Sequence, residues 1–131
     1  MRPAVLFVSP HPEDAALLSR MLRPLPLALE HVAGLEQARA KLGLQDYAVI
    51  LTEARLPDGS WLDVLSLARD AAPGARILVT DLRADARFWA EALNLGAYDL
   101  LVQPFDKSEV RRILSHACSR PAARQVSRAA L

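Results

Sequence analysis

Five short apolar runs alternate with five amphipathic stretches along this chain of 131 residues. The apolar runs are predicted strands, and they span residues 4–8, 27–32, 47–52, 76–80 and 98–102. Each run is followed by a stretch in which apolar residues recur at helical spacing, as in 34–42 and 84–95. Strands that are buried on both faces read as continuous apolar runs of this kind. The alternation therefore predicts an α/β domain in which helices cover both faces of a parallel sheet.

Composition limits the classes of protein to which this chain can belong. Hydrophobic residues make up 52% of the sequence, yet no stretch approaches the roughly 20 apolar residues that cross a membrane. The single cysteine, Cys118, excludes an internal disulfide and a multi-cysteine metal site, so a reducing, cytoplasmic setting is expected. The net charge of +1 provides no overall field that would attract nucleic acid or anionic lipid. We therefore expect neither a nucleic-acid partner nor a membrane partner.

The last part of the chain differs in charge from the rest. From Arg111 to Leu131 the sequence contains five arginines and no acidic residue. An exposed last helix followed by a frayed end explains this pattern without a binding role. We predict one domain at 1–118 and an Arg/Ala-rich C-terminal tail at 119–131.

Three segments resemble the motifs of a known family. The most specific is 95–105, Leu-Gly-Ala-Tyr-Asp-Leu-Leu-Val-Gln-Pro-Phe, and it is supported by Arg-Leu-Pro-Asp-Gly at 55–59 and Val-Ser-Pro-His-Pro at 8–12. At these separations the segments resemble the receiver domain of two-component response regulators, over residues 4–117. The resemblance implies a flavodoxin-like (βα)5 fold, a three-layer sandwich whose five parallel strands have the order 2-1-3-4-5.

The chemistry of that family depends on residues at the ends of four strands. A histidine kinase supplies a phosphoryl group to an aspartate after the third strand, and an acidic pair after the first strand holds Mg²⁺. A Ser or Thr after the fourth strand and a lysine after the fifth complete the site. In this chain the acidic pair corresponds to Ser9 and Pro10, the acceptor to Glu53 and the lysine to Gln103, and only Thr80 matches.

These replacements remove the groups that the reaction needs. Proline offers no side-chain oxygen and serine offers only a neutral hydroxyl, so Mg²⁺ binding at Ser9 and Pro10 is expected to be absent or weak. The extra methylene of Glu53 moves the carboxylate by about an ångström, and misplacement of that order can cost about 100-fold in rate. Gln103 cannot neutralise phosphate charge, and Asp81 adds negative charge beside Thr80. We expect no cofactor, no metal ligand and no enzymatic activity.

The remaining residues of this edge have simpler expected roles. We expect the Glu53 carboxylate to cap the strand-end pocket through a hydrogen bond to Thr80 or Thr52. The alternative is that Glu53 imitates a phosphorylated aspartate, although its single charge falls short of the roughly −1.5 to −2 of a phosphoryl group. Leu100 stands where the family often has an aromatic switch residue, and period-2 spacing predicts that Tyr98 lies on the same strand face.

The resemblance also indicates how the domain acts. Receivers use the face made of the fourth helix, the fifth strand and the fifth helix for dimers or partners, and its candidate interface residues here are Phe88, Trp89, Tyr98, Arg111 and Arg112. Adjacent Phe88 and Trp89 cannot both face inward, so one is an exposed anchor candidate. The chain is thus interpreted as an atypical, phosphorylation-independent receiver, a pseudo-receiver that binds a protein partner or a second copy of itself.

Two other interpretations stay open at this stage. The chain can be a receiver fragment of a longer regulator, with its arginine-rich end leading to an output domain. It can also be a small flavodoxin-like ligand binder or enzyme that uses the residual pocket of Ser9, Glu53, Thr80 and Gln103, because ligands bind at the carboxyl ends of such strands. Fold alone does not specify a chemistry.

Overall fold

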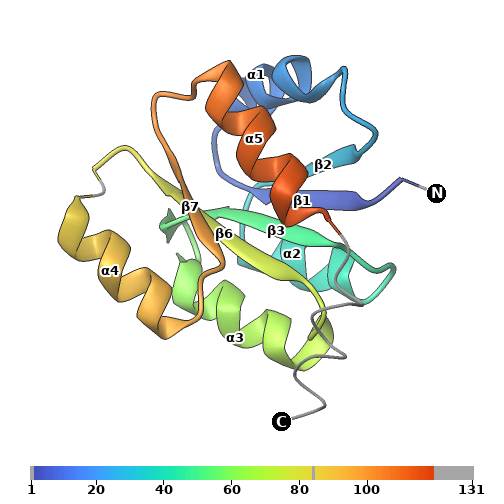
Figure 1. Cartoon of the computed structure of the whole chain (residues 1–131). Helices are drawn as coiled ribbons and strands as arrows, with labels where there is room; N and C mark the ends of the chain where they lie inside the picture. Colours follow the sequence, from blue (N-terminus) through green and yellow to red (C-terminus); the bar gives the residue numbers. More distant parts are fainter. Residues whose placement is uncertain (1, 84, 120–131) are drawn as a thin grey trace, which may run out of the picture.

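The computed structural model describes residues 2–83 and 85–119, and it contains the predicted five-stranded parallel sheet. The strands occur in the spatial order β2-β1-β3-β6-β7, which is the flavodoxin-like order 2-1-3-4-5 (Figure 1). Their bounds are β1 Ala4–Val8, β2 Ala28–Val32, β3 Val49–Glu53, β6 Arg76–Asp81 and β7 Asp99–Val102. Every neighbouring pair in this sheet is parallel. The predicted fold class is confirmed.

The helices form two layers, one on each face of the sheet (Figure 1). One layer packs on the cluster that includes Val5 and Phe7 and consists of α1 (Pro12–Leu22) and α5 (Lys107–Ala117). The other layer packs on the cluster that includes Leu6 and Val8. It consists of α2 (Leu35–Leu42), α3 (Trp61–Ala71) and α4 (Ala86–Leu95). Alternate residues of β1 thus serve opposite cores, as expected for a central strand that is buried on both sides.

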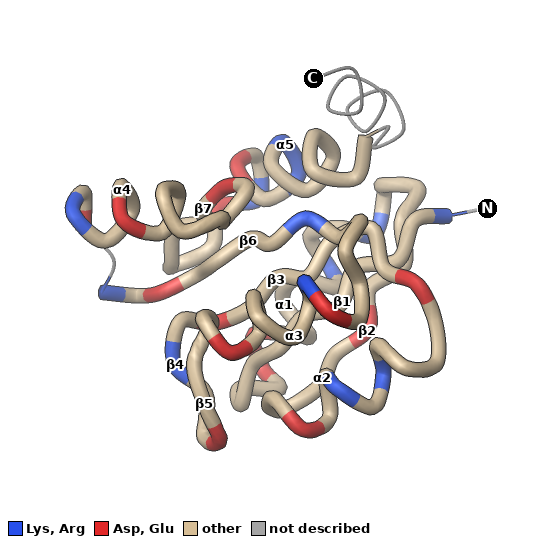
Figure 2. The backbone as a smooth tube through the Cα atoms, turned by 90° about the horizontal axis from the view of Figure 1, so that it is seen from below, with Lys and Arg blue, Asp and Glu red and all other residues tan. Residues whose placement is uncertain are grey.

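A small hairpin that the sequence did not predict follows β3. It consists of β4 (Arg55–Leu56) and β5 (Gly59–Ser60), which lie apart from the main sheet (Figure 2). The carboxylate of Asp58 at its tip accepts hydrogen bonds from the backbone N–H of Leu35 at 2.8 Å and of Glu36 at 3.1 Å. These bonds cap the start of α2, where Gly34 has no side chain to do so.

Local interactions determine where α3 begins and where α4 ends. Ser60 and Asp63 form a capping box at the start of α3, with Ser60 N–H donating to Asp63 Oδ2 at 2.9 Å. Gly96 ends α4 with a φ of +127°, a conformation that residues with a Cβ rarely adopt. Ala84, the predicted first residue of the fourth helix, lies outside the described residues, as do residues 120–131 of the predicted tail. Across 2–83 and 85–119, no helix has the length and apolar character needed to cross a membrane.

Candidate functional site

The carboxyl ends of β1, β3 and β6 meet at one edge of the sheet. Val8 is the parallel partner of Thr52, and Glu53 is the partner of Thr80, so the residues that follow β1 and end β3 and β6 are brought together. This is the edge at which ligands of doubly wound sheets bind. The structure therefore places the predicted residues Ser9, Glu53 and Thr80 in one region.

Ser9 is fully buried and is held by its backbone and its side chain. Its N–H donates to the carbonyl of Val32 at 3.0 Å, and its own carbonyl accepts from His31 Nε2 at 2.8 Å. Its hydroxyl oxygen accepts from the backbone N–H of His11 at 3.1 Å, and its hydroxyl proton is donated to Glu53 Oε2. Ser9 thus fixes the loop between β1 and α1 to the end of β3.

Glu53 lies largely under the surface, and its side chain is 14% exposed. Its Oε1 is 3.9 Å from Nε2 of His11, whose side chain is 55% exposed. Burial raises the pKa of Glu53, while the Ser9 hydroxyl and the charge of His11 act in the opposite direction, and Asp14 and Asp81 add to the rise. Burial outweighs the two favourable contacts, so the carboxyl holds its proton more tightly than an ordinary glutamate does.

The predicted hydrogen bond from Glu53 to Thr80 or Thr52 is wrong. The Thr80 hydroxyl donates its single proton to the carbonyl of Leu101 at 2.6 Å and accepts from Gln103 Nε2 at 3.0 Å. The Thr52 hydroxyl donates to the backbone carbonyl of Glu53 at 2.9 Å. Both hydroxyl protons are therefore used elsewhere, and Ser9 takes the role that was assigned to them. The edge thus contains two separate hydrogen-bonded sets of residues, one around Glu53 and one around Thr80.

The residues at this edge do not fit a resident Mg²⁺ ion. That ion requires near-octahedral oxygen ligation in which carboxylates take part. Glu53 supplies one carboxylate, and Asp14 and Asp81 are near enough to act on its charge. Pro10 supplies no side-chain oxygen, and the Ser9 hydroxyl is already engaged as both donor and acceptor. Among the described residues, no group of three or more His, Cys, Asp or Glu side chains is arranged to hold a metal.

Comparison with known proteins assigns the family. Residues 5–115 match the family described as response regulator receiver domain. The chain belongs to this family. It is 28% identical over 116 residues to the response regulator protein PilR of Pseudomonas aeruginosa, a match that covers 88% of this chain and 26% of PilR. It is 28% identical over 103 residues to the regulatory protein LuxO of Vibrio cholerae, a match that covers 79% of this chain and 23% of LuxO. The chain thus spans about a quarter of each of these relatives.

Solved receiver structures share the fold of this chain. The signal receiver domain of a putative LuxO repressor protein from Vibrio parahaemolyticus has a TM-score of 0.88 at 20% identity, with 97% of this chain and 98% of that chain covered. The beryllofluoride-activated NtrC4 receiver domain dimer has a TM-score of 0.83 at 21% identity, with 91% of this chain and 98% of that chain covered. At this identity the likeness establishes the fold.

The position of Tyr98 in this receiver corrects a further prediction. Leu100 packs in the core under α2, α3 and α4, whereas Tyr98 packs against the opposite core, so the two residues do not share a strand face. The reason is that β7 begins at Asp99, and period-2 alternation does not extend back to Tyr98. Leu100 is only 6% exposed and fills its core position as an ordinary aliphatic residue.

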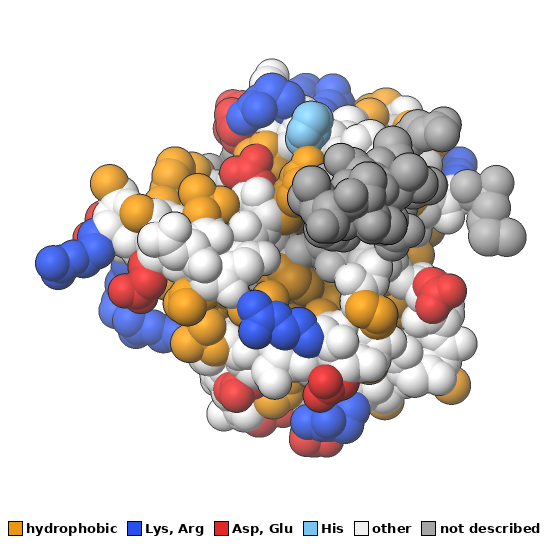
Figure 3. Space-filling view, turned by 60° about the horizontal axis from the view of Figure 1, so that its bottom comes forward, with side chains coloured by type: hydrophobic (Ala, Val, Ile, Leu, Met, Phe, Trp, Pro, Cys, Tyr) orange, Lys and Arg blue, Asp and Glu red, His pale blue; other side chains and the backbone are white. Residues whose placement is uncertain are grey.

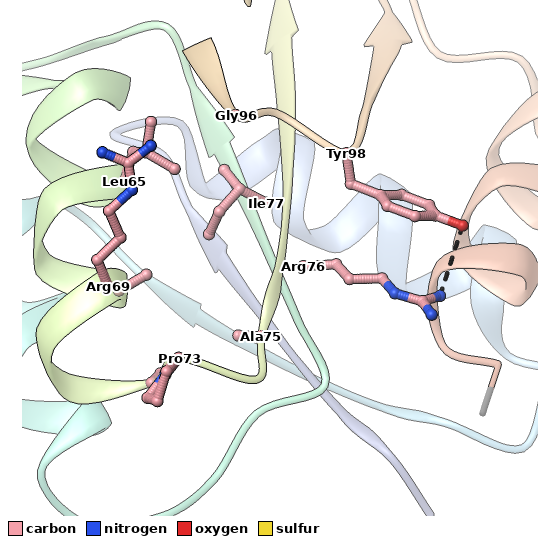
Figure 4. Close-up of a pocket in the computed structure, with 10 residues that line it drawn as sticks. Leu65, Arg69, Pro73, Ala75, Arg76, Ile77, Gly96 and Tyr98 are labelled. Atoms are coloured by element: carbon pink, nitrogen blue, oxygen red, sulfur yellow. Dashed lines mark hydrogen bonds between the residues drawn. The ribbon is translucent and has the colours of Figure 1, made fainter. Parts of the chain in front are cut away.

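Tyr98 instead belongs to a group of residues at the amino end of the receiver's sheet. Its ring lies 4.6 Å from the guanidinium carbon of Arg76, a buried arginine to which the sequence analysis gave no role. Figure 4 shows both side chains on the α5 side of β6. They line a cavity of about 180 Å³ together with Leu65, Arg69 and Ile77. Arg76 begins β6 and Asp81 ends it, so this cavity and the Glu53 site lie at opposite ends of the strand.

The other predicted interface residues of the receiver differ in exposure. Phe88 packs partly buried on the core, and Trp89 is 36% exposed, so the expected division between these neighbours is confirmed. Arg112 is exposed and pairs with Glu109, whereas Nε of Arg111 donates to the carbonyl of Met21 at 2.8 Å. Arg111 therefore turns toward α1, away from α4.

Proposed function

We propose that this receiver is a phosphorylation-independent protein-interaction module of two-component signalling. The observation that carries the proposal is the hydrogen bond from Ser9 to Glu53. A neutral hydroxyl occupies the place of a metal-binding carboxylate and is bound to the residue at the acceptor position. Neither Ser9 nor Gln103 can neutralise an incoming phosphoryl group.

The hydrogen bonds of Thr80 argue against Glu53 as a permanent imitation of the phosphorylated state. In that state the hydroxyl after the fourth parallel strand would be recruited toward the acceptor. Here it donates to the carbonyl of Leu101 on β7, and Gln103 holds it from the other side. The singly charged Glu53 thus leaves Thr80 in place, which favours a receiver whose shape is not set by phosphate.

The first prediction concerns phosphate donors. Addition of acetyl phosphate with Mg²⁺, or of beryllofluoride with Mg²⁺, is expected to leave the amide NMR spectrum and the intact mass unchanged, because the cation has no carboxylate cage. A receiver with an intact acidic pair and aspartate, treated in parallel, provides the positive control. A saturable spectral change at Glu53 and Thr80, or a mass increase of one phosphoryl group, would contradict the proposal.

The partner surface that we propose lies on α4 and β7. Ala92 is the only fully buried residue of α4, while Trp89, Leu93 and Val102 are 36%, 47% and 43% exposed. Trp89 and Leu93 are four residues apart and therefore share one side of the helix. Figure 3 shows hydrophobic side chains gathered over this part of the molecule. An exposed tryptophan beside aliphatic residues is a typical interface anchor.

The second prediction tests this surface with a second copy as the partner. Trp89→Ala is expected to weaken self-association by about 10- to 30-fold, because a central aromatic anchor contributes about 1.5 to 2 kcal/mol. Light scattering over a concentration series measures the change. Leu44→Ala is the control, because Leu44 is 79% exposed in the connection between α2 and β3, away from α4. Equal association constants for the two variants, or a monomer at every concentration, would exclude self-association through this surface.

A further inference from the structure

The Glu53 site contains a proton-binding contact between two elements that are distant in sequence. Ser9 and Glu53 are 44 residues apart, and their hydrogen bond joins the loop after β1 to the end of β3. The same loop carries His11, whose ring nitrogen lies 3.9 Å from the second oxygen of the carboxylate. Both oxygens of Glu53 therefore face groups of one loop. The charge of the carboxyl group affects how strongly it interacts with these groups.

Charged and titratable groups surround Glu53 from several elements. His11 and Asp14 act on it from the β1–α1 loop and α1, and Asp81 acts on it from the end of β6. His31 of β2 holds the carbonyl of Ser9. After β7, the predicted site residue Gln103 carries a neutral amide, which is bound to Thr80. Within the described chain, no lysine or arginine forms an ion pair with Glu53.

We propose that Ser9, His11 and Glu53 form a proton-responsive contact, in which uptake or release of a proton replaces phosphoryl transfer as the input to the β1–α1 loop. The proposal rests on the proposed function, since it names an input for a receiver that takes no phosphoryl group. The ligand is the proton itself, and no bond other than the O–H or N–H bond to that proton forms or breaks.

Two individual contacts of Glu53 are stronger when its carboxyl group is ionised. In that state Ser9 donates a charge-assisted hydrogen bond to the carboxylate, and the charge of His11 favours the ionised form. Proton uptake by Glu53 at lower pH leaves a neutral hydrogen bond and removes the attraction to His11. Burial of the charge opposes both contacts and outweighs them, so proton uptake by Glu53 favours the folded arrangement of the loop overall.

The direction of the Glu53 titration follows from its environment. Burial raises the pKa of Glu53 above the ordinary value of 4.5. The folded state consequently binds this proton more tightly than the unfolded state does. The stability that Glu53 contributes is fully present below 4.5 and is lost as the pH rises through the folded-state pKa. Release of the Glu53 proton as the pH rises thus weakens the hold of the folded structure on the β1–α1 loop.

The test is an NMR titration of the ¹³C,¹⁵N-labelled protein without any phosphate donor. The carboxyl carbon of Glu53 is expected to titrate with a midpoint above 4.5, and the amides of Ser9 and His11 are expected to shift with the same midpoint. Glu53→Gln should abolish that amide transition. His11→Gln should move the Glu53 midpoint upward, because it removes a cation that favours the carboxylate. Glu13→Gln is the matched control, since Glu13 is exposed in the first turn of α1 and should leave both transitions unchanged.

Two results would overturn the proposal: a Glu53 midpoint at or below 4.5, or the same loop transition in Glu53→Gln and the native protein. If Glu53→Gln does not fold, the Ser9→Ala variant tests the proposal instead. It should raise the carboxyl midpoint and uncouple the loop amides from it, whereas continued coupling would contradict the proposal. Modification by acetyl phosphate would instead refute the proposed function and leave the titration readable, so the two failures are distinguishable.

Discussion

Replacement of Arg76 by alanine is expected to lower the free energy of unfolding by about 2 to 4 kcal/mol, because it removes charge-assisted hydrogen bonds from a buried site. Nη1 of Arg76 donates to the carbonyls of His116 at 3.1 Å and Ala117 at 3.0 Å, the last residues of α5. These carbonyls lie in the last turn of α5, where no later helical residue donates to them, and that of His116 also accepts from Ser119. A cation at a helix C-terminus also interacts favourably with the helix dipole.

The aromatic contacts of Arg76 add to this effect. Its guanidinium lies over the ring of Tyr98, and Nη1 also approaches the Tyr98 hydroxyl at 3.5 Å (Figure 4). The Tyr98 ring in turn stacks on His116, with centroids 6.0 Å apart. Arg76, the first residue of β6, therefore connects the start of this strand to the last turn of α5.

Urea unfolding with an unchanged m-value measures the loss of stability. Arg69→Ala is the control, since Arg69 is exposed and donates to a single carbonyl, that of Leu95 at 3.1 Å. Its expected cost is below about 1 kcal/mol. Arg76→Met separates packing from hydrogen bonding, because it keeps the aliphatic stem but removes a donor from two carbonyls, of which that of His116 keeps its bonds from Ser119. We expect it to cost about 1 to 3 kcal/mol. An Arg76→Ala variant as stable as Arg69→Ala would show that the α5 terminus does not depend on this contact.

The fold was predictable because it depends on periodicity, which is a local property of the sequence. Alternate residues of β1 face opposite cores, and apolar runs such as 47–52 need no information from distant residues to be recognised as buried strands. The edge position of β2 and the clustering of strand ends at one edge follow from the same parallel arrangement. The division between buried Phe88 and exposed Trp89 likewise follows from helical geometry.

The hydrogen-bond partners at the site were not predictable in the same way. Ser9 reaches Glu53 because Val32 and His31 of β2 fix its backbone, and these contacts span more than twenty residues. Arg76 has its acceptors 40 and 41 residues away, and a lone arginine before an apolar run reads as an ordinary strand boundary. The sequence offered one signal of this contact. The last turn of α5 contains no basic residue other than His116, so a cation from another element, such as an arginine at a strand boundary, could be expected to bind its carbonyls.

Reconstruction of the site is expected to raise the response of the receiver to phosphate donors well above that of the native chain. The variant combines Ser9→Asp, Pro10→Asp, Glu53→Asp and Gln103→Lys, while Thr80 is already present. The two new aspartates supply carboxylate ligands for Mg²⁺, the shorter acceptor restores the position of the attacking oxygen, and the lysine supplies the missing positive charge. Because misplacement of a reacting group by about an ångström can cost about 100-fold, labelling by acetyl phosphate should exceed that of the native chain by at least about 100-fold.

Two readouts identify which part of the reconstruction acts. Mg²⁺ should raise the melting temperature of the reconstructed variant but not of the native protein, since a ligand that binds only the folded state stabilises it by mass action. Intact mass after acetyl phosphate treatment reports the transfer itself. Glu53→Asp alone is the matched control, and it should stay unlabelled because Ser9 and Pro10 still provide no cage for the cation. Labelling of this single variant at the level of the full reconstruction would mean that the length of the acceptor side chain, and not the loss of the metal-binding pair, is what disables the native site.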